Sequence, residues 1–262
     1  MNHKRIVYSI VIPVFNESGN VAELYKRLKK ILEGLDKSYE IIFADDGSTD
    51  DSFLLLRNIA FSDHGVRVLR FDKNYGQHKA VAAGILEAQG DYIVTLDADL
   101  QNPPEEIPGL IEKIKSGYDM VSGYRKLRKD SLGRRLPSLM TNFVIFSITG
   151  LRMHDYGSML RIYKKETAKS LAEEFKKSGG YITMLVAKVT RNIAEITVSH
   201  DARSAGRSKY NLSKLAGLFF RILFCYNENV RKALGIKTEE PFFVIERKIE
   251  DGQEAIVSNY NR

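Results

Sequence analysis

Short apolar runs alternate with amphipathic stretches over the first 122 residues. The run at residues 6–14 is apolar almost throughout, which is typical of a strand buried on both faces of a sheet. From Val21 to Leu32 the apolar side chains are spaced three or four residues apart, which predicts a helix capped by Ser18. The same reasoning predicts strands at residues 40–44, 66–71, 92–96 and 119–122, and helices at residues 52–60, 79–88 and 103–115. Repeated strand–helix units imply an α/β fold with a mostly parallel sheet and right-handed crossovers.

The pattern changes after Gly123, where a segment rich in basic residues is followed by an apolar stretch at residues 136–151. The later elements that we expect are extended segments at 156–163 and 193–198, helices at 165–188 and 212–226, a polar, basic loop at 202–211, and a strand-like run at 241–245. The second half of the chain is therefore expected to add a smaller, helical and basic region to the sheet.

Charge adds to this picture more than composition does. The chain has 262 residues, of which 44% are hydrophobic and 28% charged, and it suits one large domain or one domain with an appendage. Its net charge of +7 favours an anionic partner, which can be a nucleotide, a lipid phosphate, a membrane surface or nucleic acid. The absence of Trp, of an aromatic RNA-binding signature and of a zinc motif argues against nucleic acid.

Two features bear on the compartment. Cys225 is the single cysteine, which excludes an intramolecular disulfide and favours a reducing compartment. The apolar run after the basic N-terminus is short and contains Pro13, so we interpret it as a strand and not as a signal peptide. No stretch reaches the roughly 20 apolar residues that a membrane-spanning helix needs. We therefore expect a cytoplasmic chain, either soluble or peripheral on the inner face of the cytoplasmic membrane.

A first acidic motif, DDGSTD, occupies residues 45–50, directly after the second expected strand. In an open parallel sheet, ligands bind beyond the carboxyl ends of the strands. Gly47 permits a tight turn there, and either Ser48 or Asp50 can cap the next helix, so turn chemistry explains half of the motif. It does not explain the two adjacent carboxylates, which suit the ribose hydroxyls or base N–H groups of a nucleotide. We therefore favour a nucleotide site over a turn alone.

A second acidic motif ends the fourth expected strand. Asp97 and Asp99 are separated by one residue, so one or both can hold a metal ion that also binds two phosphates. Mg²⁺ and Mn²⁺ prefer such oxygen ligands, with water and phosphate completing the shell. A lone Asp-X-Asp is most often a solvated acidic turn. Here an apolar strand precedes it and a helix opened by Pro103 and Pro104 follows, so we expect Mg²⁺ or Mn²⁺ at this position.

Three segments in this order resemble the signatures of the family 2 glycosyltransferases, which have the GT-A fold. They are PVFNE at residues 13–17, DDGSTD at 45–50 and DAD at 97–99. The sequences QNPP at 101–104 and RSAGRSKY at 203–210 narrow the resemblance to the dolichol-phosphate mannose synthase branch, especially its bacterial polyprenyl-phosphate glycosyltransferases. Each motif alone is moderately specific, whereas their order and spacing together are strongly specific.

The resemblance covers residues 6–224 and implies a division of the chain. A GT-A glycosyltransferase domain with a Rossmann-like sheet would span residues 1–226. Its nucleotide-sugar half would lie at about 1–122, and its helical, basic acceptor half at about 123–226. Residues 227–262 depart from the family pattern and would form an extension of unknown role, either docked on the domain or placed at a dimer interface.

The resemblance also assigns a donor site. The residues that would line the base and ribose pocket or lie near it are Pro13, Glu17, Asp45 and Asp46. The residues that would hold the metal and the donor diphosphate, or adjoin them, are Asp97, Asp99 and Gln101. Lys79 lies in a segment that helps to shape the donor pocket in the family. Arg203 and Lys209 would come from a loop that closes over the phosphates.

On the acceptor side, Arg125 and Arg135 resemble the arginines that receive the acceptor phosphate. This assignment agrees with the guanidinium fork, which suits phosphate oxygens, although a basic segment can also be a solvated face. Asp155 lies where many relatives place an acidic residue beside the acceptor. It would act as a general base toward a hydroxyl acceptor, or orient groups around a phosphate that is already anionic. A third interpretation is that it is a turn residue before Gly157.

We therefore expect an inverting, metal-dependent transfer of a sugar from a nucleoside-diphosphate sugar to a polyprenyl phosphate at the membrane surface. The resemblance favours UDP as the nucleotide. Two alternatives stay open, namely a soluble family 2 glycosyltransferase with a saccharide or another hydroxyl acceptor, and a non-catalytic nucleotide-sugar-binding protein. The apolar stretches at 136–151 and 215–226 suit packing on the domain, a membrane surface, a membrane-protein partner or a second copy of the chain.

Overall fold

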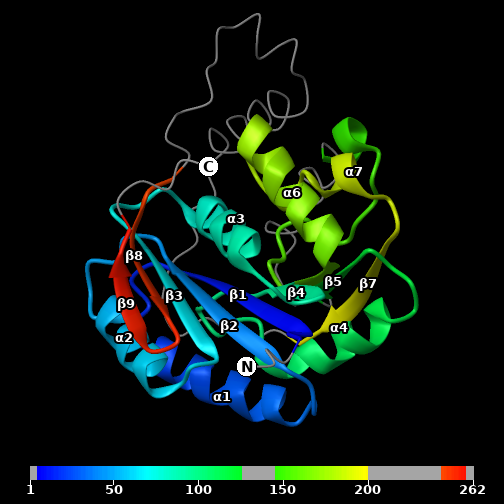
Figure 1. The fold of residues 1–262 in the computed structure, drawn as a ribbon. Coiled ribbons are helices and arrows are strands. Elements are labelled where there is room, and N and C mark those ends of the chain that lie inside the picture. Colours follow the sequence, from blue (N-terminus) through cyan, green and yellow to red (C-terminus); the bar gives the residue numbers. More distant parts are fainter. Residues whose placement is uncertain (1–4, 126–144, 200–242, 258–262) are drawn as a thin grey trace, which may run out of the picture.

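The structure is a computed structural model that describes residues 5–125, 145–199 and 243–257. These residues form a nine-stranded sheet with helices on both faces (Figure 1). The strands are β1 (Tyr8–Val14), β2 (Tyr39–Asp45), β3 (Val66–Phe71), β4 (Tyr92–Thr95), β5 (Met120–Arg125), β6 (Arg161–Lys164), β7 (Ile193–Val198), β8 (Ile245–Glu250) and β9 (Gln253–Ile256). The helices are α1 (Val21–Glu33), α2 (Ser52–Ser62), α3 (Gln77–Glu87), the 3₁₀ turn η1 (Pro104–Glu106), α4 (Ile107–Ile114), α6 (Lys165–Ser178) and α7 (Val186–Val189).

The strand order is β7-β5-β6-β4-β1-β2-β3-β8-β9. Strand β1 pairs in parallel with β2 on one side and with β4 on the other, whereas β6 and β8 run antiparallel to both of their neighbours. The chain leaves β1 through β2 and β3, and then crosses back to continue as β4 on the opposite side. The carboxyl ends of β1 and β4 therefore flank a topological switch point, where open α/β sheets bind their ligands. The expected α/β fold with a mostly parallel sheet is confirmed.

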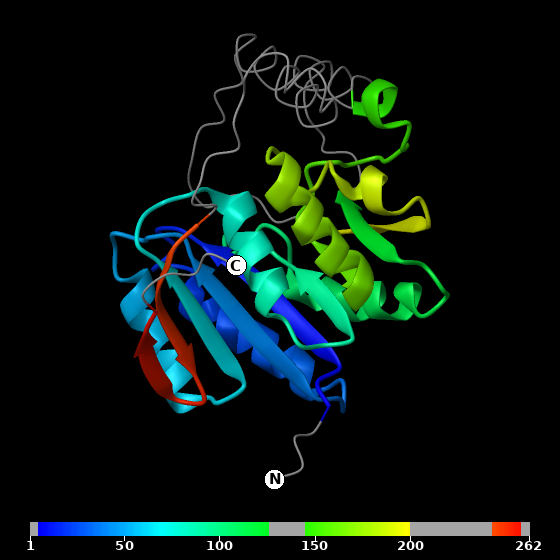
Figure 2. The same ribbon diagram turned by 45° about the horizontal axis from the view of Figure 1, so that its top comes forward.

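Strand β1 shows how the two helical layers form. Ile10 and Ile12 are buried in the cluster that includes α1, α2 and α4, whereas Val11 is buried in the cluster that includes α3 and α6. Figure 2 shows these two groups of helices on opposite faces of the sheet. Helix α3 lies so close to β1 that a Cβ on Gly84 would be 2.3 Å from Cγ1 of Val11. Helix α3 is thereby packed directly against β1 at the centre of the sheet.

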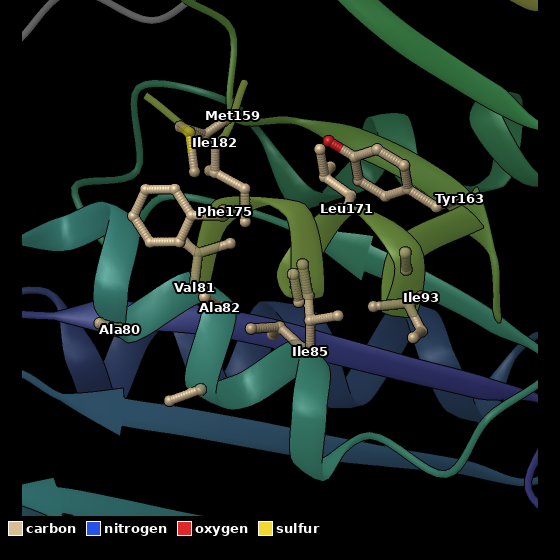
Figure 3. Close-up of a cluster of buried hydrophobic side chains, with 14 of the residues drawn as sticks. Ala80, Val81, Ala82, Ile85, Ile93, Met159, Tyr163, Leu171, Phe175 and Ile182 are labelled. Carbon is tan, nitrogen blue, oxygen red and sulfur yellow. The ribbon is translucent and has the colours of Figure 1, made fainter. Parts of the chain in front are cut away.

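The cluster between α3 and α6 fixes the position of α3 from its other side. Phe175 and Leu171 of α6 pack in the same buried cluster as Val81 and Ile85 of α3 (Figure 3). Burying one such side chain contributes about 1.5–3 kcal/mol. The amino end of α3, which borders the switch point, is therefore held on a packed layer.

The predicted elements of the first 122 residues agree with the structure to within three residues, but the cap of α1 was predicted wrongly. Ser18 does not cap this helix, which follows Asn20, and the amide of Ser18 donates instead to Oδ2 of Asp50. The continuous helix expected at 165–188 is wrong at residues 179–185, since it is interrupted between α6 and α7. Gly179 and Gly180 have φ values of 67° and 84°, which end α6 before the short α7.

Two extended segments also differ from expectation. Of residues 156–163, only the end forms a strand, because β6 begins at Arg161. Of the strand-like run at 241–245, residues 241 and 242 lie outside the described residues, and among the other three only Ile245, where β8 begins, is in a strand. Residues 251 and 252, an Asp-Gly pair with φ values of 51° and 69°, then form a two-residue turn that leads into β9.

The β8–β9 hairpin extends the sheet, because β8 pairs antiparallel with β3. A group of charges joins the hairpin to the amino ends of the central strands. The buried guanidinium of Arg67 in β3 lies 2.9 Å from Glu40, 2.9 Å from Glu87 and 3.0 Å from Glu250 of β8. Lys248 of β8 lies 2.8 Å from Glu87. Residues 245–256 of the expected extension therefore dock on the domain through the pairing of β8 with β3.

Among the described residues, no helix combines the length and the apolar character needed to cross a bilayer. The expected helix at 212–226 and the expected loop at 202–211 lie outside the described residues, as does most of the apolar stretch at 136–151.

Candidate active site

The carboxyl ends of β1, β2 and β4 bring the acidic motifs to one edge of the sheet. Val14, the last residue of β1, pairs with Asp45, the last residue of β2. On the other side, Val11 pairs with Thr95 at the end of β4, and the amide of Leu96 donates to the carbonyl of Val11. Asp97 therefore follows at the level of Pro13, a buried residue of β1. The two motifs that the sequence separates by about 50 residues lie on the two sides of β1.

Asp45 is a buried acceptor at this edge, with a relative exposure of 0%. Its Oδ1 accepts a hydrogen bond from the amide of Ser48 at 3.1 Å. Its Oδ2 has no hydrogen-bond partner among the described residues, and Nε of Arg70 lies 3.8 Å away. Burial raises the pKa of Asp45 above its ordinary value, while the bonds from Ser48 and the charge of Arg70 oppose that rise. A buried oxygen with unused acceptor capacity is suited to a ligand N–H or O–H group.

Unlike Asp45, Asp46 uses both of its carboxylate oxygens to accept hydrogen bonds from backbone amides. Its Oδ1 accepts from the amide of Tyr75 at 2.6 Å, and its Oδ2 accepts from the amide of Gly76 at 2.8 Å. Burial raises the pKa of Asp46 to about 6, although these two amide bonds lower it. Asp46 therefore fixes the segment that enters α3.

The turn after Asp46 requires glycine. Gly47 has a φ of +69°, and a Cβ at this position would lie 2.5 Å from the carbonyl carbon of Lys73. The 45–50 turn is thus packed directly against the backbone of the segment before α3.

The segment after β1 is bonded to the same turn. Oγ of Ser48 accepts from the amide of Asn16 at 3.0 Å, and Oγ of Ser52 accepts from the amide of Glu17 at 2.8 Å. Oε2 of Glu17 accepts from the side chain of Asn20 at 2.6 Å. Glu17 is thereby placed beside the 45–50 turn. The hydroxyl of Ser48, which the sequence offered as a helix cap, binds the neighbouring loop instead.

Asp97 and Asp99 are partly exposed, whereas Ala98 between them is buried with a relative exposure of 4%. Oδ1 of Asp97 accepts a hydrogen bond from the side-chain amide of Gln77. Oδ1 of Asp99 accepts from the backbone amide of Gln101 at 3.1 Å. Both carboxylates thus remain accessible at the end of β4.

These carboxylates fit a Mg²⁺ or Mn²⁺ ion that is bound together with a diphosphate. Two carboxylate side chains with water and phosphate oxygens are a usual ligand set for such ions. The described residues contain no group of three or more His, Cys, Asp or Glu side chains that could hold a metal without other ligands. Water and diphosphate oxygens would complete the shell of an ion held by these two carboxylates.

Lys79 lies in the first turn of α3 and is half-buried. Its Nζ is 5.3 Å from the centre of the Tyr75 ring, and its charge is close enough to Asp46 to lower the pKa of that carboxyl. Lys79 thus belongs to the same group of residues as Asp46.

The turn that contains Asp155 borders the same edge from the other side, because β6 runs antiparallel to β4 and begins near its carboxyl end. Oγ1 of Thr95 donates to the carbonyl of Met159 at 2.6 Å, which joins the end of β4 to the segment before β6. Oδ1 of Asp155 accepts from the amide of Gly157 at 3.0 Å, so Asp155 does have the turn geometry offered by the sequence. Asp155 is partly exposed, so its carboxylate is accessible both for the role of a general base and for the role of an orienting group.

Two residues that the sequence analysis missed hold this turn. Glu195 of β7 accepts hydrogen bonds from the amide of His154 at 3.0 Å and from the amide of Asp155 at 3.4 Å. Arg161 of β6 has a relative exposure of 0%, and its guanidinium donates to the carbonyls of Tyr156 and Thr183 at 2.9 Å each. A signal was present in each case, because a charged residue stands inside an otherwise apolar expected strand.

The remaining site residues are less fully described. Arg125 is the last residue of β5, whose carboxyl end lies at the same edge as that of β4. Arg135, Arg203 and Lys209 lie outside the described residues. The structure thus brings together the predicted donor residues of the first half and the Asp155 turn.

Comparisons with known proteins bear on the family and the fold of the chain. A family model described as Glycosyl transferase family 2 matches residues 9–173, which is more than half of the chain. The chain is 40% identical over 229 residues to the undecaprenyl-phosphate 4-deoxy-4-formamido-L-arabinose transferase of Pseudomonas paraeruginosa, covering 87% of this chain and 67% of that protein. It is 44% identical over 216 residues to the protein of the same name from Shewanella sediminis, covering 82% and 65%. The chain thus spans about two thirds of the length of these relatives.

Among solved structures, glucosyl-3-phosphoglycerate synthase from Mycobacterium tuberculosis, in complex with Mn²⁺ and UDP-glucose, has a similar fold. The TM-score is 0.59 at 16% sequence identity, with 91% of this chain and 85% of that chain covered. The similarity supports the GT-A fold expected from the sequence. The family is enzymatic, so the binding-only alternative is set aside. The match to the family model and the identity to these relatives show that the chain belongs to the family 2 glycosyltransferases.

Proposed function

We propose that the chain transfers a sugar, with inversion, from a UDP-sugar to a polyprenyl phosphate, using Mg²⁺ or Mn²⁺. The observation that carries the proposal is the placement of two accessible carboxylates, Asp97 and Asp99, across β1 from the buried acceptor Asp45. The donor's base and ribose would lie at the Asp45 side and its diphosphate at the Asp97 side.

In this proposal the donor is bound by residues from three strand ends. Asp45 accepts from the base or ribose through its buried Oδ2, while Pro13 and Glu17 line the same pocket. Asp97 and Asp99 hold the metal, and Gln101 adjoins the diphosphate. Lys79, together with Arg203 and Lys209, supplies positive charge toward the phosphates. When bound, the metal would stabilise the negative charge that develops on the departing nucleoside diphosphate.

The acceptor assignment rests on the relatives, which are named as undecaprenyl-phosphate sugar transferases, and on the arginines Arg125 and Arg135. A lipid phosphate is anionic before the reaction and needs no deprotonation, so Asp155 would orient the groups around it. With a hydroxyl acceptor, Asp155 would instead remove the proton. The turn geometry of Asp155, braced by Glu195, suits the orienting role because it holds the carboxylate in one place.

The division of the chain is part of the proposal. Residues 1–226 would be the catalytic domain, with the donor half up to residue 122 and the acceptor half after it. The enzyme would act as a peripheral protein on the inner face of the cytoplasmic membrane, where a lipid acceptor and a soluble donor meet. A membrane-protein partner or a second copy of the chain could share that surface.

The test is the release of nucleoside diphosphate from UDP-, GDP- and dTDP-sugars, with Mg²⁺ or Mn²⁺, in the presence and absence of a polyprenyl phosphate in detergent. We expect release that requires the UDP-sugar, the metal and the lipid together. Metal-dependent release that ignores the lipid would contradict the acceptor and favour a saccharide or another hydroxyl acceptor. Release without a metal would contradict the roles of Asp97 and Asp99.

A further inference from the structure

Gln77 joins the amino end of α3 to the end of β4. It is the first residue of α3, its side chain is exposed, and its amide nitrogen donates a hydrogen bond to Oδ1 of Asp97. The two residues belong to different strand–helix units. Neither the acidic motifs nor the resemblance to the family assigns a role to this glutamine.

The position of Gln77 is set by the residues directly before it. Tyr75 and Gly76 both donate their backbone amides to the carboxylate of Asp46, at 2.6 Å and 2.8 Å. Asp46 is itself fixed, because it is buried and its own amide donates to the carbonyl of Val14 at 2.8 Å. The close approach of Gly47 to the backbone of Lys73 packs the 45–50 turn against the segment that leads into Tyr75. A continuous set of bonds therefore runs from Asp46, through Tyr75, Gly76 and Gln77, to Asp97.

We propose that Gln77 is a positioning residue for Asp97, and that Asp46 acts on Asp97 by fixing Gln77. The inference rests on the proposed function, in which Asp97 binds the metal and the donor diphosphate. A carboxylate on an unrestrained side chain rotates about two bonds, and a donor on one of its oxygens restricts that rotation. Groups that orient a metal ligand in this way typically change metal affinity by about 10–100-fold when they are removed. The second aspartate of the DDGSTD motif would thus serve the DAD motif without contacting the donor.

If Gln77 positions Asp97, loss of its N–H donor should lower metal affinity, whereas loss of an ordinary surface hydrogen bond should not. Replacing Gln77 by Met preserves the length of the side chain but removes the N–H donor. We expect Gln77→Met to weaken Mn²⁺ binding in the presence of UDP by about tenfold or more. The melting temperature of the metal-free protein should stay close to that of the wild type, because the side chain is exposed. Bound Mn²⁺ is measured from the electron paramagnetic resonance signal of the free ion, so the readout does not depend on turnover.

The matched control is Gln89→Met. Gln89 is exposed and lies just beyond the opposite end of α3, where its backbone amide, which the substitution leaves in place, donates to Glu40. We expect this variant to bind Mn²⁺ within twofold of the wild type. If Gln77→Met also binds within twofold, the positioning role is wrong while the proposed function stands. If the wild type itself does not bind Mn²⁺ with UDP, the proposed donor site fails, and the inference fails with it.

The second half of the inference is tested by combining substitutions. Asp46→Asn removes one of the two carboxylate oxygens that hold Tyr75 and Gly76. If Asp46 acts through Gln77, the double variant Asp46→Asn/Gln77→Met should bind Mn²⁺ no more weakly than the more affected single variant. Losses that multiply in the double variant would show that Asp46 acts by another route. Circular dichroism of each variant establishes that it is folded, and the Gln77 result stands even where Asp46→Asn is not.

Discussion

At the scale of single residues, two residues near the carboxyl ends of β1 and β4 have a left-handed backbone conformation. Asn16, after β1, has a φ of 55°, and Leu100, directly after Asp99, has a φ of 60°. Asparagine tolerates this region, whereas for a branched side chain such as leucine it costs on the order of 1–2 kcal/mol. Backbone strain of this kind concentrates at functional sites. The strain at Leu100 accompanies the turn in which the amide of Gln101 bonds to Asp99.

The first residue-scale prediction concerns Asp99. Replacing it with Asn keeps its shape and its bond from Gln101 but removes the charge that would hold the metal. Transfer should fall by about 10²–10³ in kcat, the scale seen when a preorganised charge stabiliser is removed. Asp36→Asn is the control, because Asp36 is exposed and its φ of 48° suits asparagine. Near-normal turnover by Asp99→Asn, measured as nucleoside diphosphate release, would contradict the metal assignment.

A second prediction concerns Gly47. Alanine at this position must adopt a φ of +69° and place its Cβ 2.5 Å from the backbone carbonyl carbon of Lys73. The backbone conformation alone costs on the order of 1–3 kcal/mol, and the displaced loop adds to that cost. Urea unfolding should show the loss. Gly19→Ala is the matched control, because a Cβ added there would meet nothing within 4 Å and the φ of Gly19 is not positive. Equal stability of the two variants would contradict the close packing of this turn.

A third prediction concerns the pH dependence of stability. Burial raises the pKa of Asp46 from 3.8 to about 6, so the folded state binds its proton more tightly than the unfolded state does. The stability contributed by the protonated carboxyl is therefore fully present below pH 3.8 and is lost as the pH rises through about 6. Relative to Asp46→Asn, the wild type should lose about 2 kcal/mol between about pH 4 and pH 7. A difference in unfolding free energy that stays constant over this range would contradict the assignment.

The residues of the site differ in how far the sequence could predict them. Asp45, Asp97 and Asp99 stand in motifs at the ends of apolar runs, and pattern alone places them at one edge of the sheet. Gln77 could not be found in this way, because it acts on a residue that is distant in the sequence. Glu195 stands out as a charged residue inside an apolar expected strand, but the turn that it holds is distant in the sequence. Their roles depend on which helix and strand lie beside the motifs, and that is a property of the tertiary structure.

At the scale of elements, local sequence predicted the strands and helices that are strongly periodic, whereas the bounds or partners of the others were missed. Helix α6 ends at Ser178 because Gly179 and Gly180 adopt positive φ, a local signal that the amphipathic pattern on both sides obscured. The β8–β9 hairpin carried a visible Asp251-Gly252 turn signal. Its partner could not be inferred, because β8 pairs with β3, which lies far away in the chain.

The element-scale prediction tests the charges that join this hairpin to the sheet. Arg67→Met would leave the buried carboxylate of Glu40 without its cation. Removing one partner of a buried pair typically destabilises a protein by about 3–5 kcal/mol. The control is Arg5→Met, which breaks the exposed pair with Asp91, and such surface pairs contribute about 0–1 kcal/mol. Chemical denaturation of both variants measures the contrast, and similar losses would contradict a stabilising role for the buried group.

At the scale of the whole molecule, the excess positive charge belongs to two segments of the sequence. Residues 126–144 contain five basic residues and one acidic residue, and residues 200–242 contain eight basic and four acidic. The rest of the chain is almost neutral. The same segments contain Arg135, Arg203 and Lys209, which we assign to phosphates, and much of the apolar sequence of the second half. Positive charge beside apolar residues is the combination that attracts a protein to an anionic membrane surface.

The corresponding prediction is that the protein binds anionic vesicles at low salt and that a few residues of the first segment carry much of this binding. Changing Lys126, Arg128 and Lys129 to Gln should weaken binding roughly a hundredfold, since each basic residue near such a surface contributes about 1 kcal/mol.

The control changes Lys26, Lys30 and Lys37 to Gln. These residues are exposed on and after α1, and the control lowers the net charge by the same amount. Sedimentation with vesicles of anionic and of neutral lipid gives the comparison, and raised salt should abolish the difference because it screens exposed charges. Equal losses in the two triple variants would mean that net charge alone drives the binding. Wild-type protein that ignores anionic vesicles at low salt would contradict the peripheral location, and the acceptor would then have to be sought in solution.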